Sequence, residues 1–354
     1  MAKTKGYLCN AGFKKAPTWP TPVLLGAGDG FQIKSESLEK TVDLLEDDAI
    51  NGRLVPFPGV AGKQTAGGSF DSVWTYDGLD VLIALTLGTA GAPTQQGSTL
   101  SYKHTWKVKD DQEGLFGTLG LYKSFEVWEG ANAKPKSVEF TLDAGANGST
   151  TFEMDAYTFN QNVGSGTNKL STWGTVALPT NAAIPKIVTF SQMSVYLNTQ
   201  AGAAPVGGDL IYVSKFAVKF ARAQEGDLTT MYGTYIEEPM PTANATVEGS
   251  FEVPSYGSEH ASLVSALASK AEQKVKVVCT GPVCDGAYNY SFIIYLNNVQ
   301  LSTGTPNVKD RGKVPLSVAF TAHSASAAPT GWPSGGTEAM ILEVINKRNT
   351  DALA

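Results

Sequence analysis

The chain has 354 residues, enough for two domains of ordinary size, and 42% of them are hydrophobic, so we expect a folded protein. Only 17% of the residues are charged, which leaves a surface poor in charge unless other protein covers much of it. The formal net charge of −6 comes without any cluster of Lys and Arg, which excludes tight binding to nucleic-acid phosphates.

The segments before residue 180 are predicted to form mostly strands and one helix. The first candidate strand, residues 31–42, is polar on both faces, which is unusual for a strand that lies on a core. Apolar residues recur at helical spacing over 79–86 and stop at Gly88, so a short helix is expected there. Further along, apolar and polar residues alternate over 138–143 and 152–155, which is typical of half-buried strands.

The segments after residue 180 repeat this arrangement. Alternation over residues 216–221 and a β-rich run over 291–296 predict strands. A second short helix is expected over 263–267, after Ser258. Both predicted helices are expected to cover an open face of a small β-sandwich.

Each half also has an acidic loop between a polar strand and a return strand, which begins at Gly52 in the first half and at Gly233 in the second. The acidic side chains of these two loops are Asp43, Glu46, Asp47, Asp48, Glu225 and Asp227. Two interpretations stay open. Each loop is either a solvated hairpin tip, or a hairpin that extends from the body to meet another subunit or to face a water-filled passage.

The most informative feature is an internal repeat over about half the chain. Gly68-Ser69-Phe70-Asp71 reappears as Gly249-Ser250-Phe251-Glu252, at an offset of 181 residues. Residues 135–141 match residues 315–321 at an offset of 180. Two separate blocks in the same order and at nearly the same offset indicate a tandem duplication.

The duplication predicts two domains, residues 1–180 and residues 181–354. The boundary is expected near 179–185, a stretch of Thr, Asn, Ala and Pro without hydrophobic periodicity. A length difference between the copies is expected in a loop, because insertions there have little effect on stability.

Candidate catalytic and metal-binding residues are few. His104, His260 and His323 lie far apart in the sequence and are expected to be ordinary surface or interface residues. Cys279 and Cys284 have no second pair to complete a zinc site, so the cysteines are expected to be small buried thiols in a reduced compartment. No nucleophile elbow or phosphate-binding glycine loop is present. The sequence therefore predicts no enzyme, no catalytic residue, no metal and no cofactor.

The sequence also gives no sign of a membrane segment. No apolar stretch approaches the roughly 18 residues of a membrane span. The first ten residues lack the apolar core of a signal peptide. We expect synthesis in the cytoplasm and no membrane partner.

The order of several short motifs resembles that of the tail tube proteins of long-tailed bacteriophages. The resemblance is clearest over residues 31–160. The motifs that carry it are Ile33-Lys34-Ser35-Glu36-Ser37-Leu38, Asn51-Gly52-Arg53, Ala66-Gly67-Gly68-Ser69-Phe70-Asp71, Tyr76-Asp77-Gly78-Leu79-Asp80 and Leu85-Thr86-Leu87-Gly88. His104-Thr105-Trp106 and Ser137-Val138-Glu139-Phe140-Thr141 look like the continuation of the series.

This resemblance implies a mainly β fold with two tandem tail-tube-like β-sandwich or barrel domains, each with a short flanking helix. In such a fold, strands of adjacent domains join edge to edge into a barrel around a lumen, and the rings stack into a tube. The hairpin loops, residues 43–51 and 225–232, are then expected to reach toward the next ring. Because the chain carries two copies, three chains are expected to form a ring with pseudo-sixfold symmetry; a hexamer of chains is the alternative.

The resemblance also implies partners and a location. DNA is expected to pass through the lumen without specific binding, and the net negative charge agrees with acidic walls that repel phosphate. Tape measure, tail terminator and tail tip proteins are the expected protein partners. The protein is expected in the virion tail, after assembly in the cytoplasm of the host bacterium.

Two other functions remain open from the residues alone. One is a tandem β-sandwich binding module that recognises carbohydrate or a host receptor through Trp and Tyr. Against it, Trp74, Trp106 and Trp128 lie in predicted strands, where packing in a core or an interface is the usual role. The other is a hydrolase whose site depends on one of the three histidines or on a pair of acids.

Overall fold

The structure is a computed structural model of the chain. Asp47, Asp48 and the expected linker at 179–185 lie outside the residues that it describes. The described residues are 6, 9–46, 55, 58–123, 126–161, 176–178, 186–231, 233–308 and 311–354.

The described part of the first half is built from antiparallel strands and one α-helix. The bounds of its elements are β1 Cys9–Lys15, β2 Gly30–Phe31, β3 Ile33–Glu36, β4 Glu39–Leu45, β5 Val60–Val73, α1 Asp80–Leu87, β6 Thr94–Gln95, β7 Tyr102–Lys107, β8 Gly117–Lys123, β9 Val127–Asp143 and β10 Ser149–Gln161.

The described part of the second half has the same character. Its strands and α-helix are β11 Met193–Thr199, β12 Leu210–Ile211, β13 Lys215–Ala221, β14 Gln224–Glu225, β15 Met240–Pro241, β16 Thr246–Val253, α2 Ala261–Ser269, β17 Gln273–Asp285, β18 Tyr288–Thr303, β19 Leu316–His323 and β20 Met340–Asn346. Three single turns of 3₁₀ helix are also present, at Phe190–Gln192, Gly207–Asp209 and Ser258–His260.

The predicted strands and helices are confirmed. Helix α1 ends where Gly88 adopts a φ of +97° and donates its N–H to the carbonyl of Ala84, a left-handed cap that favours glycine. The alternating segments at 138–143 and 152–155 lie in β9 and β10. The polar segment at 31–42 is extended, but it is divided among β2, β3 and β4.

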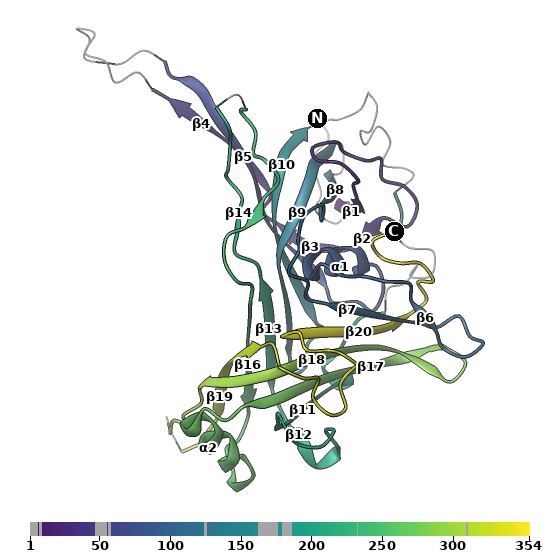
Figure 1. Ribbon diagram of the computed structural model, residues 1–354, viewed down its shortest axis with the longest axis vertical. Coiled ribbons are helices and arrows are strands. Elements are labelled where there is room, and N and C mark those ends of the chain that lie inside the picture. Colours follow the sequence, from purple (N-terminus) through teal and green to yellow (C-terminus); the bar gives the residue numbers. More distant parts are fainter. Residues whose placement is uncertain are drawn as a thin grey trace.

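A single antiparallel sheet joins the two halves. Its strands follow the order β4–β5–β10–β9–β13–β16–β19–β18, and β3 also pairs with β5. The junction is the ladder between β9 and β13, which runs from Asp143 opposite Lys215 to Ser137 opposite Ala221. In Figure 1 this sheet passes from the protruding arm of β4 and β5 down to β18 and β19.

Each half has the same order of paired strands. In the first half the order is β2–β1–β8–β9–β10–β5–β4. In the second half it is β12–β11–β17–β18–β19–β16–β13. A tandem duplication would produce this shared order, in which β9 corresponds to β18 and β10 to β19. The sequence match of residues 135–141 with residues 315–321 would place β9 on β19, so this second block of the predicted repeat is wrong. The two halves are joined by a second strand pairing, between β20 and β7.

One face of the joined sheet is apolar and lies on a core that both halves share. Val138 and Phe140 of β9 are fully buried. Trp74 follows β5 directly. Its ring packs against the rings of Phe140 and of Phe292 on β18, with 5.0 Å and 5.3 Å between the ring centroids. Because this aromatic cluster combines residues of both halves, we expect the halves to unfold together.

Replacing Gly68 with alanine is expected to lower the free energy of unfolding by about 2–3 kcal/mol. Gly68 has a φ of +133°, and a Cβ there would lie 2.5 Å from the carbonyl oxygen of Ser37, so the backbone would be strained and β5 pushed from its neighbour. The matched control is Gly145→Ala, because Gly145 has a φ of +83° but no atom within 4 Å of a Cβ. The control should lose only about 1 kcal/mol. Equal losses in chemical denaturation would contradict this steric explanation.

Candidate functional site

The face of the joined sheet that points away from the core carries small and charged side chains. On β9, Glu139, Thr141 and Asp143 alternate with the buried apolar residues. Lys219 of β13 lies directly opposite Glu139, and its ammonium contacts the carboxylate of Glu153 on β10 at 2.8 Å. We call this surface, formed by the outward side chains of β5, β10, β9, β13 and β16, the polar sheet face.

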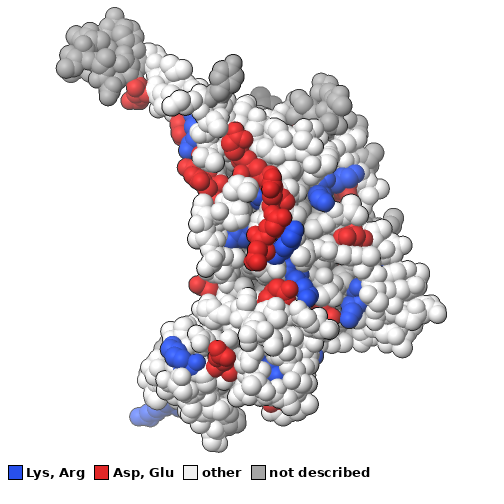
Figure 2. All heavy atoms as spheres, in the orientation of Figure 1, with Lys and Arg blue, Asp and Glu red and all other residues white. Residues whose placement is uncertain are grey.

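Acidic side chains outnumber basic ones on the polar sheet face. The hydrogen bond from Lys219 lowers the pKa of Glu153, so this carboxylate is ionised at neutral pH. The acids on this face are Asp71, Glu139, Asp143, Glu153, Asp155, Glu248 and Glu252, against Lys63, Lys136, Lys215 and Lys219. On the side of the molecule that Figure 2 shows, most of the surface carries no charge, and a group of acidic side chains lies below the protruding arm.

The structure brings three of the predicted loop residues to one groove. Asp43, on the exposed strand β4, lines the groove together with Glu225 of β14 and Asp227. Lys63 of β5 binds Asp227 across it, with 3.2 Å between the ammonium and the carboxylate. Glu46 is exposed just beyond β4, outside the groove.

The second acidic loop lies against the first half of the same chain. Gln224 donates a hydrogen bond to Asp155 of β10 at 2.9 Å. The backbone N–H of Gln64 donates to the carbonyl of Thr234 at 2.7 Å. In addition, the ring of Tyr235 stacks on that of Tyr157, with 4.7 Å between the ring centroids. Gln224, Thr234 and Tyr235 therefore pack against β5 and β10 of the first half.

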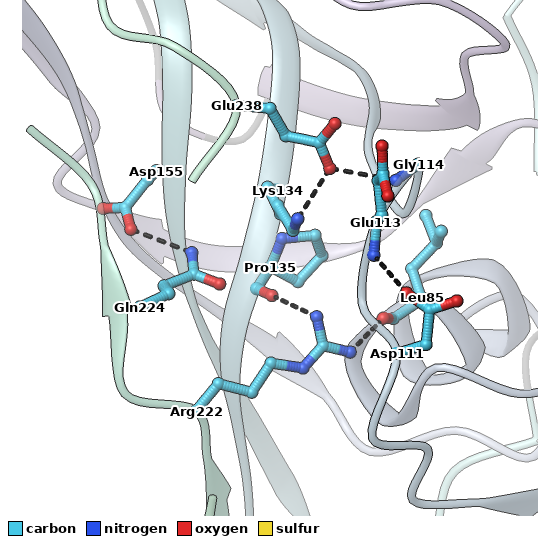
Figure 3. A network of polar contacts seen from close by, with 10 residues as sticks. All are labelled: Leu85, Asp111, Glu113, Gly114, Lys134, Pro135, Asp155, Arg222, Gln224 and Glu238. Carbon is cyan, nitrogen blue, oxygen red and sulfur yellow. Dashed lines mark hydrogen bonds and ion pairs between the residues drawn. The ribbon is translucent and has the colours of Figure 1, made fainter. Parts of the chain in front are cut away.

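A buried cation secures the junction between the halves, as Figure 3 shows. Arg222 follows β13, and its guanidinium donates to the carbonyls of Leu85 and Thr86 at the end of α1 and to that of Pro135 on β9. The carboxyl end of a helix is partially negative, which favours a cation there. Burial lowers the pKa of Arg222 to about 9, so the group is still charged at neutral pH.

A second ion pair lies beside Arg222. The buried ammonium of Lys134 on β9 contacts the carboxylate of Glu238 at 2.7 Å, and the N–H of Gly114 donates to the same oxygen (Figure 3). Burial lowers the pKa of Lys134, and the bond to Glu238 opposes that shift. Arg222 and Glu238 both lie in the connection from β13 to β16. They bind this connection to the first half at two places.

Arg222 was not predicted from the sequence, although the pattern of β13 carries a signal for it. Phe216, Val218 and Phe220 occupy alternate positions of β13 and are all fully buried. Arg222 is the next residue with the same parity, so the alternation itself places it toward the core. A cation at a buried position needs partners, and the helix end supplies them.

The joined sheet has an open edge at each end within the described part of the chain. At one end, β4 pairs with β5 and with no other strand there. At the other end, residues 304–308 continue from β18 without a strand partner. An open edge exposes unpaired N–H and C=O groups, which another strand can satisfy.

The structure does not gather the other candidate residues into a site. His104 was expected at a surface or an interface, and this expectation is wrong: the ring is 1% exposed, and Nε2 bonds to the carbonyl of Arg348 at 2.9 Å. The alternation of β7 turns His104 inward. Cys279 and Cys284 are buried, as predicted. Within the described ranges no three His, Cys, Asp or Glu side chains are placed to hold a metal ion.

Neither α-helix of the described part has the length and apolar character needed to cross a membrane. Trp74 and Trp106 are fully buried, which confirms their predicted role in core packing. Trp128 of β9 is half-buried, and its indole N–H donates to Glu126 at 2.8 Å.

Comparison with known proteins gives one family. Residues 6–322 match the family model Phage_tube_2, described as phage tail tube protein. No curated protein matches the chain. Among solved structures, the chain is similar to the SPP1 tail tube, a hybrid structure from solid-state NMR and cryo-EM. The sequence identity is 9% and the TM-score 0.29, and the match covers 38% of this chain and 75% of the SPP1 chain.

Proposed function

This chain belongs to the phage tail tube protein family, and we propose that three copies of it close into each ring of the tube. As a member of that family it is a structural component of the virion tail, and its copies assemble into a stacked tube. We infer pseudo-sixfold symmetry for the ring, in which residues 1–180 and 181–354 are the two units of each chain. A ring of six chains is the alternative.

The observation that carries this proposal is the ladder between β9 and β13. It joins the two halves edge to edge within one chain, as the family resemblance implies for neighbouring units of a ring. One chain then fills two ring positions, and three chains fill six. The open edges at β4 and at 304–308 lie at the two ends of the joined sheet, where sister chains can close them. Closure of a barrel removes every exposed edge.

The stoichiometry is tested by the mass of an assembled ring. Purified protein is assembled into tubes, and the mass per unit length is combined with the ring spacing from electron micrographs. We expect three chains of 37.3 kDa in each ring. Six chains per ring would favour the alternative, and protein that stays monomeric under every assembly condition would contradict the proposal.

We further propose that the polar sheet face lines the lumen. Its excess of carboxylates repels DNA phosphates over a Debye length of about 8 Å at physiological salt, so that DNA passes without being held. Tape measure, tail terminator and tail tip proteins are the proposed partners, and the host cytoplasm is the proposed place of assembly. No catalytic step is assigned to the chain. Family membership gives no support to the alternative of a carbohydrate-binding or receptor-binding module.

Reversing charge on this face should make tubes retain DNA. We expect tubes of the double variant Asp143→Lys and Glu248→Lys to co-sediment with short DNA at low salt and to release it as salt rises, because the added cations bind phosphate. Wild-type tubes should retain almost none. The matched control is Asp111→Lys with Glu113→Lys, two exposed acids away from the sheet face. Equal retention by both variants would contradict the assignment of the lumen.

A further inference from the structure

We propose that residues 303–308 of one copy pair with residues 36–41 of the next copy, in the register that β9 and β13 adopt within the chain. The inference rests on the proposed ring and names the contact that closes it. The partner is a second copy of this chain, because the two segments lie at opposite ends of one joined sheet, and each lacks a strand on its outer side within the described residues.

The register of the first segment follows from its neighbour β5. Phe216 of β13 lies opposite Phe251, and Glu36 of β3 lies opposite Phe70. Phe70 and Phe251 are corresponding residues of the repeated Gly-Ser-Phe sequence. Glu36 therefore corresponds to Phe216, and residues 36–41 correspond to the strand that already pairs with β9.

The register of the second segment follows in the same way. Met154 of β10 lies opposite Gly68, and Phe320 of β19 lies opposite Gly249. Since the two glycines correspond in the repeat, Met154 corresponds to Phe320. Residues on β10 can therefore be matched to residues on β19 one by one, with Glu153 at the place of Ala319.

These matched residues align β9 with the end of β18. Ser137 of β9 lies opposite Glu153, and Thr303 of β18 lies opposite Ala319. Thr303 therefore corresponds to Ser137, which is where the ladder from β9 to β13 begins. Residues 304–308, which follow Thr303, therefore correspond to the part of β9 that pairs with β13.

The chemistry of residues 304–308 agrees with this alignment. Gly304 is buried and, with Pro306 and Val308, takes the positions of Val138, Phe140 and Leu142 that face the core. Val308 is 76% exposed in the single chain, so a strand of another copy can contact its side chain. Pro306 takes the place of Phe140, whose N–H points toward Val218 in the ladder between β9 and β13, so the proposed ladder lacks this one hydrogen bond.

The next copy offers the strand that corresponds to β13. Leu38, partly buried against the core, falls opposite Pro306. Lys40 falls opposite Gly304 and Glu36 opposite Val308, so charged side chains stand where β13 has Phe220 and Phe216. On the polar sheet face, Ser37 falls opposite Asn307. Ser37 and Asn307 are both exposed in the single chain, and both would point into the lumen.

Cysteine pairs test the register in assembled tubes of the full chain. In the variant Ser37→Cys with Asn307→Cys, mild oxidation should produce covalent dimers and trimers on a non-reducing gel, because directly opposed residues meet the distance limits of a disulfide. The ladder of bands should end at three chains. Each single variant should give no such ladder.

Two further pairs serve as controls. Thr141→Cys with Ala217→Cys joins residues that lie opposite each other within one chain, so it should oxidise without a change in mass. Ser37→Cys with Thr305→Cys is displaced by two residues and should link at least tenfold less. If tubes form and the internal control oxidises while Ser37→Cys with Asn307→Cys stays reduced, the inferred register is wrong and the proposed function stands. If no tubes form under any condition, the proposed function fails, and the inference fails with it.

Discussion

Replacing Trp74 with alanine should lower the free energy of unfolding by about 4 kcal/mol, the largest effect that we expect from a single substitution. The indole is fully buried and packs against Phe140 at 5.0 Å and Phe292 at 5.3 Å. Removing it leaves a cavity between strands of both halves. The loss should therefore appear as a shift of one cooperative unfolding transition, measured by calorimetry or chemical denaturation.

Two controls separate this packing effect from a general loss of tryptophan. Trp74→Phe should lose about 1–2 kcal/mol, because a ring remains and the indole N–H has no hydrogen-bond partner to lose. Trp128→Ala, at a half-buried position, should lose about 1–2 kcal/mol as well. Two separate transitions, of which Trp74→Ala shifts only one, would mean that the halves do not share a core.

The second large effect concerns Asp77, a residue that is only 5% exposed. Burial, helped by the nearby charge of Asp80 and opposed by Lys347, raises its pKa from 3.8 to about 7. A group whose pKa is raised on folding contributes most stability below its unfolded pKa and loses that contribution as pH rises. This contribution should therefore fall by about 4 kcal/mol between roughly pH 4 and pH 7.

Asp77→Asn should remove this pH dependence, since the amide cannot ionise. We expect the variant to melt above the wild-type temperature at pH 8 and close to it at pH 4. Asp43→Asn, on the exposed strand β4, is the matched control and should follow the wild-type melting curve at both pH values. An Asp77→Asn variant that is less stable than wild type at pH 8 would show that ionised Asp77 stabilises the fold.

The local structure was predictable from the sequence because local periodicity determines it. Alternation of Val138 and Phe140 with Glu139 requires a strand with one buried face, and this is how β9 lies in the sheet. The spacing of Leu79, Leu82 and Ile83 followed by Gly88 led directly to α1 and its left-handed cap.

The pairing of distant strands was not predictable in this way. Nothing in the alternation of β9 or β13 specifies that Phe140 lies opposite Val218, because any strand of the same polarity pattern fits. The acidic loops posed the same difficulty. Glu225 and Asp227 had the composition of a free hairpin tip, yet Asp227 binds Lys63 from a segment far away in the sequence.

Charged and polar residues in the core were the other source of error. Arg222 and His104 belong to types that are mostly exposed; His104 was predicted at a surface or an interface, and no position was predicted for Arg222. Arg222 is buried because the end of α1 presents carbonyls to it, and His104 because the carbonyl of Arg348 accepts its N–H. Such partners exist only once the chain has folded.

A cryo-EM projection along the axis of an assembled tube tests the central claim most directly. We expect a hollow ring with three chains, threefold symmetry and six similar lobes, whose inner wall is the polar sheet face. Six chains around the ring, or a molecule that seals β4 and 304–308 within itself, would contradict the proposed closure between copies.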